Sequence, residues 1–255
     1  MISFIGAGPG DPDLLTVKGQ KRLAEADVVI YAGSLVNPAV LRVCRPEAEI
    51  YNSASMTLEA VLAVMERAVG EGKKVARLHT GDPSIYGAIR EQMDALDERN
   101  IPYEVIPGVS SFLAAAASLR KEFTLPDVSQ TVIITRLAGR TPVPEKESLA
   151  GLAQHKASLC IFLSTHRLDQ VTAELIAGGY PADTPAAVVY KASWPDEKTV
   201  RGTLRDIAGK VAEAGISRTA MIMVGQFLEG PYQRSLLYHP AFAHGYREAE
   251  RGNGE

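Results

Sequence analysis

Residues 2–15 read I-S-F-I-G-A-G-P-G-D-P-D-L-L, a short apolar run followed by three glycines at alternate positions. A hydrophobic strand that ends in a glycine-rich turn is typical of the first unit of an open α/β sheet, and such units often bind nucleotides. The turn therefore raises the question of whether it holds a phosphate group.

The chemistry of this turn argues against phosphate. A dinucleotide site requires G-x-G-x-x-G with a helix that begins inside the motif, whereas here Asp11 stands in place of the third glycine. Pro9 has no backbone N–H to offer, and the charges of Asp11 and Asp13 repel an anion. The next helix is expected to begin late, near Thr16, and the Walker spacing is missing. We predict that the turn binds something other than phosphate.

Apolar, β-branched runs recur through the first half of the chain with helical patterns between them. This alternation predicts βαβ units and a mostly parallel sheet in an α/β fold. The expected strands are 2–5, 28–31, 49–51, 75–78 and 103–106.

The second half repeats the strand and helix alternation after a proline-containing connector around Pro126. Strands are expected at 131–135, 159–163, 187–190, 199–202 and 220–224. The loop before 199–202 is too short for a parallel crossover, so the second sheet is predicted to be mixed. We predict two α/β domains, residues 1–120 and 121–238, and a polar tail at 239–255.

Two more turns rich in glycine and proline follow predicted strands. They read H-T-G-D-P-S-I-Y-G at 79–87 and P-G-V-S-S-F at 107–112. Open α/β sheets bind ligands at the carboxyl ends of their strands, so the three turns are candidates for one site. Each turn alone is equally compatible with an ordinary strand-to-helix connection.

Composition adds few constraints. A net charge of −3 gives no overall attraction to nucleic acid or anionic lipid. The two cysteines are far apart and the five histidines have no metal-ligand spacing, so we predict no disulfide and no protein-bound metal. The chain shows no signal peptide and no apolar run long enough to span a bilayer, which favours a soluble cytoplasmic protein.

The three turns together carry a resemblance to a known family. G-A-G-P-G-D-P-D-L-L-T at 6–16, G-D-P-S-I-Y-G at 81–87 and I-P-G-V-S-S at 106–111 resemble the tetrapyrrole methylases. Within that family, T-L-P-D-V-S-Q-T-V-I-I-T-R at 124–136 and G-R-T-P-V-P-E at 139–145 resemble the members that methylate precorrin-4.

The resemblance implies a methyltransferase that uses S-adenosylmethionine to methylate C-11 of precorrin-4 in cobalamin biosynthesis and releases S-adenosylhomocysteine. It also implies a homodimer and an active-site trough between the two domains. The net charge and the lack of a long apolar run lead us to expect no nucleic-acid or membrane partner. Carried over position by position, it assigns donor binding to Pro9, Gly81, Asp82, Ile85, Ser110, Ser111, Leu163, Ala187, Thr219 and Ala220.

Methyl transfer to an electron-rich ring carbon needs positioning more than a strong base, so no catalytic dyad is expected. Asp82 is a weak candidate for a general base, and a turn-shaping or donor-binding role is the alternative. His79 either takes part in proton transfer or carboxylate binding, or fills an ordinary structural role.

A corrin precursor carries many acetate and propionate groups, so the implied substrate requires local cations. Arg136 and Arg140 are the leading candidates because a guanidinium can fork onto a carboxylate. Lys191 and His166 are further substrate-binding candidates, and Arg167 is a surface charge that can also serve. The lone Trp194 is expected to pack or to anchor an interface.

Other functions remain open at this point. One alternative is another enzyme of the same family, such as a uroporphyrinogen-III methyltransferase or a ribosomal RNA ribose methylase of related fold. A different class is a non-catalytic S-adenosylmethionine sensor, against which the three intact turns argue.

Overall fold

The computed structural model describes residues 1–33 and 35–249. The chain divides into two compact units. The first comprises Met1–Leu119 with two later segments, Val189–Thr199 and Thr219–Met221, and the second comprises the rest of the chain. The boundaries predicted at residues 120 and 238 treat each domain as one continuous stretch, and they stay a prediction.

The first unit contains a five-stranded sheet in the order β3-β2-β4-β1-β5 in which all neighbours run parallel, as predicted. Its strands are β1 (Ile2–Gly6), β2 (Val28–Tyr31), β3 (Glu49–Asn52), β4 (Val75–His79) and β5 (Tyr103–Ile106). Its α-helices are α1 (Val17–Ala24), α2 (Leu58–Gly70), α3 (Arg90–Glu98) and α4 (Ser111–Leu119).

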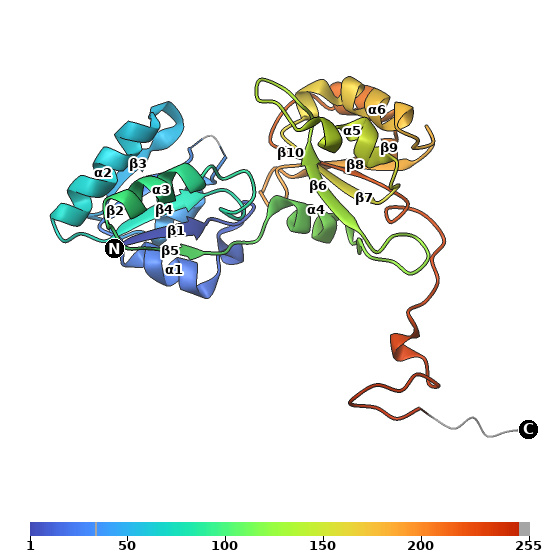
Figure 1. Cartoon of the computed structure of the whole chain (residues 1–255), viewed down its shortest axis with the longest axis horizontal. Helices are drawn as coiled ribbons and strands as arrows, with labels where there is room; N and C mark the ends of the chain where they lie inside the picture. Colours follow the sequence, from blue (N-terminus) through green and yellow to red (C-terminus); the bar gives the residue numbers. More distant parts are fainter. Residues whose placement is uncertain (34, 250–255) are drawn as a thin grey trace, which may run out of the picture. The chain divides into compact units, whose positions relative to one another are not determined.

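Helices cover both faces of this sheet, which explains why its central strands are buried and mostly apolar, apart from Ser3, Arg77 and His79. On one face Phe4 and Ile30 pack with Met65 of α2 and Leu96 of α3. On the other face Ile5, Val29 and Leu78 pack with Leu23 of α1. Figure 1 shows α1 on the opposite side of the sheet from α2 and α3. The strands therefore lie between two layers of helices, and only their ends are accessible to ligands.

The second unit contains a sheet that is mixed, as predicted, with the strand order β6-β7-β10-β8-β9. β6 runs parallel to β7, whereas β7 and β10 are antiparallel. Its strands are β6 (Val132–Arg136), β7 (Ser158–Phe162), β8 (Pro185–Tyr190), β9 (Lys198–Thr203) and β10 (Ala220–Val224). Its α-helices are α5 (Leu149–Ala153), α6 (Leu168–Ala177) and α7 (Ile207–Glu213).

Short 3₁₀ turns complete the described part of the chain. They are η1 (Pro12–Leu14), η2 (Pro38–Val43), η3 (Ser53–Ser55), η4 (Glu145–Glu147), η5 (Thr165–Arg167) and η6 (Leu236–Tyr238). The one that matters for the glycine turn is η1, because it occupies the space in which a dinucleotide-binding helix would begin. α1 begins only at Val17, where the hydroxyl of Thr16 accepts a hydrogen bond from the Gly19 N–H at 3.1 Å.

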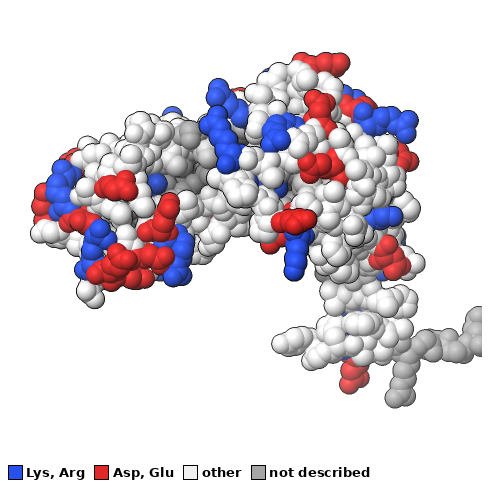
Figure 2. All heavy atoms as spheres, turned by 45° about the horizontal axis from the view of Figure 1, so that its top comes forward, with Lys and Arg blue, Asp and Glu red and all other residues white. Residues whose placement is uncertain are grey.

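Opposite charges are interspersed on the protein surface. Glu104 pairs with Lys18 and with Arg22, and Glu49 pairs with Arg67 and with Lys73. Figure 2 shows the same mixing of basic and acidic side chains on the face in view. This distribution has the character of a solvated surface rather than of one extended charged stripe.

The predicted tail begins just after η6. Within its described residues, Nη2 of Arg247 lies 2.9 and 3.1 Å from the carbonyl oxygens of His239 and Phe242. The rest of the predicted tail, 250–255, lies outside the described residues. In the described part of the chain, no helix is long and apolar enough to cross a membrane.

Candidate functional site

Two of the three glycine-rich loops at the carboxyl edge of the first sheet are joined through their backbones. The Gly81 N–H donates to the Gly8 carbonyl at 2.8 Å, and the Gly8 N–H donates to the Gly81 carbonyl at 3.3 Å. Both residues have positive φ, 72° for Gly8 and 60° for Gly81, a region that favours glycine. The loop after β1 and the loop after β4 therefore form a two-residue bridge.

The third loop packs on this bridge without room for side chains. A β-carbon on Gly6 would lie 2.5 Å from the Cα atom of Gly108, and one on Gly108 would lie 2.2 Å from the Gly81 carbonyl oxygen. Both distances are far below van der Waals contact, and the opposing atoms belong to the backbone. The glycines are thus needed so that three backbones can approach one another.

Asp82 ties the second loop to the third. Its Oδ1 accepts a hydrogen bond from the Ser84 N–H at 2.8 Å, and its Oδ2 accepts one from the Gly108 N–H at 2.9 Å. Both carboxylate oxygens are therefore engaged by backbone donors. This geometry favours the turn-shaping alternative for Asp82 over a general base.

The start of α4 lies against the bridge. A β-carbon on Gly81 would lie 3.3 Å from the Cα atom of Ser110 and 3.5 Å from the backbone nitrogen of Ser111. Among the described residues, neither serine hydroxyl has a hydrogen-bond partner, in contrast to Ser118 in the last turn of α4. Two polar groups are thus available beside the joined loops.

The remaining predicted donor residues of the first unit lie in the same loops. Pro9 is buried, and Ile85 closes the second loop by donating its N–H to the Asp82 carbonyl at 3.3 Å. Just beyond it, Tyr86 and Ala88 have positive φ of 54° and 48°. Such strain in residues other than glycine persists only where the surroundings enforce it, and it is concentrated at functional loops.

His79 closes β4 directly before the second loop. It is 4% exposed, its Nε2 has no hydrogen-bond partner among the described residues, and burial together with the charge of Arg77 lowers its pKa to about 3. The imidazole is therefore neutral at physiological pH and shielded from any exposed ligand. These features fit the structural role for His79 and not a proton donor.

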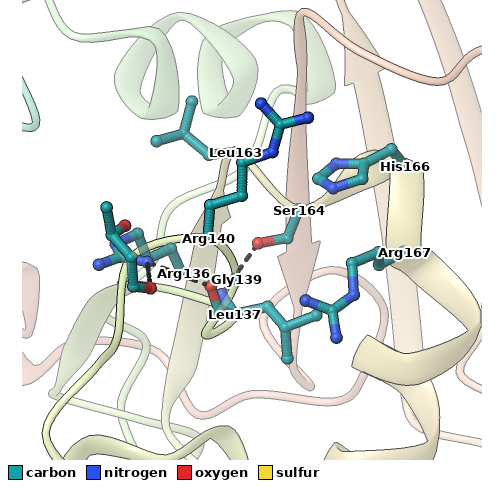
Figure 3. A pocket seen from close by; sticks show the side chains of 9 residues that line it. Arg136, Leu137, Gly139, Arg140, Leu163, Ser164, His166 and Arg167 are labelled. Atoms are coloured by element: carbon teal, nitrogen blue, oxygen red, sulfur yellow. Dashed lines mark hydrogen bonds between the residues drawn. The ribbon is translucent and has the colours of Figure 1, made fainter.

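The second unit holds a cavity of about 340 Å³ next to β6 and β7. It is lined by Arg136, Leu137, Gly139, Arg140, Thr141, Leu163, Ser164, His166 and Arg167. Figure 3 shows these side chains around the loop that follows β6. The cavity combines three arginines with a histidine, which suits a ligand that carries several carboxylates.

Two of the arginines hold the loop itself. Arg136 donates from Nη2 to the Pro142 carbonyl at 2.8 Å and from Nη1 to the Thr141 carbonyl at 3.1 Å. Arg167 donates from Nη1 to the Ala138 carbonyl at 2.7 Å. The fork of Arg136, which the sequence suggested for a substrate carboxylate, is engaged with the backbone of residues 141–142.

Arg140 and His166 are the free members of the cavity. Both are exposed, and within the described residues neither side chain has a hydrogen bond or ion pair. In Figure 3 the Arg140 guanidinium and the His166 imidazole extend away from the Arg136 guanidinium. Arg140 in particular offers a complete set of N–H donors on a loop that other side chains hold in place.

Lys191 is not among the residues that line this cavity and belongs to the first unit. Its Nζ pairs with Asp196 at 2.6 Å and lies 4.9 Å from the ring centre of Trp194. The hydrogen bond that Lys191 donates to the Asp196 carboxylate raises the pKa of Lys191. The charge of Lys191 is therefore already neutralised inside the protein.

The donor residues predicted for the second half of the chain fall in different places. Leu163 is exposed with φ of 55° and lines the cavity, whereas the side chain of Ala187 is buried inside β8. Thr219 and Ala220 belong to the first unit, where the Thr219 carbonyl accepts a hydrogen bond from the Lys191 N–H at 2.9 Å. Leu163 and Ala187 are in the second unit.

Two contributors to the candidate sites were not identified from the sequence. Ser164 is buried and accepts a hydrogen bond from the Leu137 N–H at 2.9 Å, which fixes the base of the loop beside the cavity. The segment 191–197 contributes Ser193 and Glu197 to the first unit. Nothing in the sequence around Ser164 indicates its role beside the cavity. The segment 191–197 could have been noticed, because it contains the lone tryptophan of the chain next to a proline.

No group of three or more His, Cys, Asp or Glu side chains with metal-binding geometry occurs among residues 1–33 and 35–249. The expectation that the protein binds no metal of its own stays a prediction.

Comparisons with known proteins agree on the type of molecule. The sequence pattern of the tetrapyrrole (corrin/porphyrin) methylases matches residues 1–208. The chain is 59% identical to the cobalt-precorrin-4 C(11)-methyltransferase of Methanocaldococcus jannaschii, over 98% of this chain and 97% of that protein. The crystal structure of a cobalt precorrin-4 methyltransferase matches with a TM-score of 0.88 and 50% identity, over 89% of this chain and 95% of that one.

A more distant structure contains a ligand. Uroporphyrin-III C-methyltransferase from Thermus thermophilus, in complex with S-adenosylhomocysteine, matches with a TM-score of 0.74 and 26% identity, over 89% of this chain and 93% of that one.

Proposed function

Because the chain belongs to the tetrapyrrole (corrin/porphyrin) methylases, we propose that it transfers a methyl group from S-adenosylmethionine to C-11 of precorrin-4, giving precorrin-5 in cobalamin biosynthesis. The similarity over nearly the whole chain to a cobalt-precorrin-4 C(11)-methyltransferase carries this proposal. The same relative favours the cobalt complex of precorrin-4 over the metal-free form as the acceptor.

The joined loops of the first unit hold the methyl donor. We call the backbone groups around Gly81, the buried turn at Pro9 and the hydroxyls of Ser110 and Ser111 the donor cradle, and its loops at 6–10, 80–85 and 107–111 include no lysine or arginine. Such a cradle suits a ligand without phosphate that carries a positive sulfonium and a zwitterionic amino-acid end. Asp82 and Ile85 contribute by fixing the second loop, and Thr219 and Ala220 complete the donor set that we propose for the first unit. The assignment of Leu163 and Ala187 to donor binding stays a prediction from the family resemblance.

The cavity of the second unit binds carboxylate side groups of the acceptor. Arg140 and His166 supply its free polar groups, and Arg136 and Arg167 hold the loop on which Arg140 lies. Lys191 joins the substrate-binding set only if its pair with Asp196 opens. A charge-assisted hydrogen bond to a carboxylate contributes about 1.5–3 kcal/mol, enough for Arg140 alone to affect acceptor binding measurably.

The donor, when bound, supplies a methyl group on a positively charged sulfur that becomes a neutral thioether. The electron pair of C-11 forms the new carbon–carbon bond as the carbon–sulfur bond breaks, and the positive charge passes to the acceptor. The residues of this chain therefore bind and orient the reactants, an effect that contributes on the order of 7–11 kcal/mol to lowering a barrier. Asp82 and His79 are not required as acid or base, because their groups are engaged or buried.

Product analysis tests the proposal. The protein is incubated with donor labelled in its methyl group and with precorrin-4 in the metal-free or the cobalt form, and the product is examined by mass spectrometry and NMR. We expect one labelled methyl at C-11, formed faster with the cobalt complex. Methylation of uroporphyrinogen III instead of precorrin-4 would contradict the assigned acceptor, and binding of S-adenosylhomocysteine without methylation of any tetrapyrrole would indicate a sensor.

We also propose that the protein works as a cytoplasmic homodimer. Its two cysteines are free, which suits a reducing compartment. Leu236 and Tyr238 next to the tail leave 64% and 82% of their surfaces exposed, and such apolar side chains suit a contact with a second copy of the chain. Sedimentation analysis tests the oligomer, for which we expect twice the 27.4 kDa mass of the chain.

A further inference from the structure

Residues 191–197, K-A-S-W-P-D-E, connect β8 to β9 but belong to the first unit. We call this segment the strap. Two of its residues other than glycine have positive φ, 47° for Lys191 and 69° for Ser193. Backbone strain of this kind requires strong contacts that hold it in place, and the strap makes such contacts with the first glycine-rich loop.

Trp194 lies directly on that loop. Its Nε1–H donates to the Pro9 carbonyl at 2.8 Å. A β-carbon on Gly10 would lie 2.0 Å from Cδ1 of the indole, so the ring packs flush against the glycine backbone. Beside it, the Asp11 N–H donates to the Ser193 hydroxyl at 3.0 Å. The strap thus engages two successive peptide groups of the loop and the surface of the residue between them.

The other end of the strap is fixed to the helix that begins in the third loop. Oε2 of Glu197 accepts hydrogen bonds from the Ser193 N–H at 2.6 Å and from the Ser118 hydroxyl of α4 at 2.9 Å. The same carboxylate therefore stabilises the turn that presents Ser193 and ties that turn to α4. Through these contacts the strap links the first loop to the element that carries Ser110 and Ser111.

We infer that Trp194 is a positioning residue for the methyl donor, because its indole N–H and ring hold the Pro9–Gly10 turn in the shape that the donor site uses. The inference rests on the proposed function, since it treats Pro9 as part of the donor site. Trp194 itself need not touch the donor. Its effect passes through the orientation of the Pro9 carbonyl and the position of Gly10.

Donor affinity measured by calorimetry with S-adenosylhomocysteine tests the inference. Trp194→Phe keeps an aromatic ring but removes the N–H, and we expect it to weaken binding about fivefold, the typical effect of one lost hydrogen bond. Gly10→Ala drives a methyl group into the indole, and we expect binding at least fiftyfold weaker. In the double variant Gly10→Ala/Trp194→Ala the collision is gone, so affinity should return to within about tenfold of the unchanged protein.

Because Trp194 is the single tryptophan of the chain, its fluorescence provides a second readout with one source. Titration with S-adenosylhomocysteine should change its emission and give the same dissociation constant as calorimetry. Tyr246→Phe, at a fully exposed position outside the strap, is the matched control and should leave affinity and emission response unchanged.

The outcomes are separable. If Trp194→Phe lowers the unfolding temperature but binds S-adenosylhomocysteine as tightly as the unchanged protein, and the double variant is no better than Gly10→Ala, the strap is only structural and the inference is overturned. If the unchanged protein does not bind S-adenosylhomocysteine at all, the proposed function fails together with the inference. An acceptor KM that stays constant in Trp194→Phe while the donor KM rises would support the inference.

Discussion

The two candidate binding regions differ in the atoms that shape them, which are backbone atoms in one and side-chain atoms in the other. In the first unit the loops around Gly6, Gly81 and Gly108 are held together by backbone atoms in close approach. In the second unit the cavity is shaped by long side chains, with Arg136 and Arg167 donating to the carbonyls of a loop. A backbone-built site tolerates almost no added atom, whereas a side-chain-built site changes in steps as single groups are removed.

The strongest test of this contrast is Gly108→Ala. The new methyl group would lie 2.2 Å from the Gly81 carbonyl oxygen, so the second and third loops must separate. We expect S-adenosylhomocysteine affinity to fall at least a hundredfold in calorimetry, with a lower unfolding temperature. Gly70→Ala is the control, because a β-carbon there meets nothing within 4 Å. Normal donor binding by Gly108→Ala would remove the distinction between the two regions.

Lysine substitutions in the cavity test the side-chain side of the comparison. Arg140→Ala should raise the acceptor KM about tenfold through loss of one charged hydrogen bond, and Arg140→Lys should recover most of it. Arg136→Lys should be as damaging as Arg136→Ala, because an ammonium group cannot span the Thr141 and Pro142 carbonyls as the guanidinium does. Steady-state kinetics gives the KM values, and donor affinity should stay within twofold in all four variants. If the two lysine variants behave alike, the roles assigned to Arg136 and Arg140 are not distinct.

The pH dependence of stability tests whether His79, directly before the second loop, is kept neutral by burial in the folded protein. Burial lowers the pKa of His79 to about 3 in the folded protein, whereas the unfolded chain protonates its histidines near pH 6.5. The unfolded state therefore binds more protons between these values, and stability is lost as the pH falls through this window, by up to about 1.4 kcal/mol per pH unit. Urea unfolding at pH 7 and pH 5 measures the slope. His79→Asn should flatten it, and an unchanged slope would show that His79 does not titrate as its burial implies.

The smallest expected difference between the two regions is in how ionic strength affects ligand binding. Screening weakens attraction between exposed charges, so raising the ionic strength from 0.05 to 0.5 M should increase the acceptor KM about threefold. Donor affinity, which depends on backbone groups, should change much less. A larger salt effect on the donor than on the acceptor would reverse the comparison.

The sequence predicted the fold well because periodicity and chain connectivity dominate it. The expected strand at 28–31 is observed as Val28–Tyr31, and the late helix start follows from the capping residue Thr16. The mixed second sheet followed from a connection too short for a crossover. These signals are local in the sequence, and the packing of helices on both faces of the first sheet favours the same strands.

The sites were predictable only in part. The glycine spacing drew attention to the three loops and led to the prediction that they bind no phosphate, which stays a prediction. The contact between Trp194 and Pro9 joins residues 185 positions apart and has no local signal. The sequence also predicted the same role, binding of a substrate carboxylate, for both Arg136 and Arg140. Whether a guanidinium meets a ligand or its own backbone depends on the path of the loop, and periodicity carries no information about that path.

The strap has a consequence for how the molecule is made. The β1 loop leaves the ribosome early, but Trp194 is translated almost two hundred residues later, so the turn at Pro9 and Gly10 lacks its partner through most of synthesis. At about 5–20 residues per second, the wait lasts roughly 9–37 s. The nascent first sheet can assemble in that interval, while its ligand-binding turn is finished only when the chain returns from the second half.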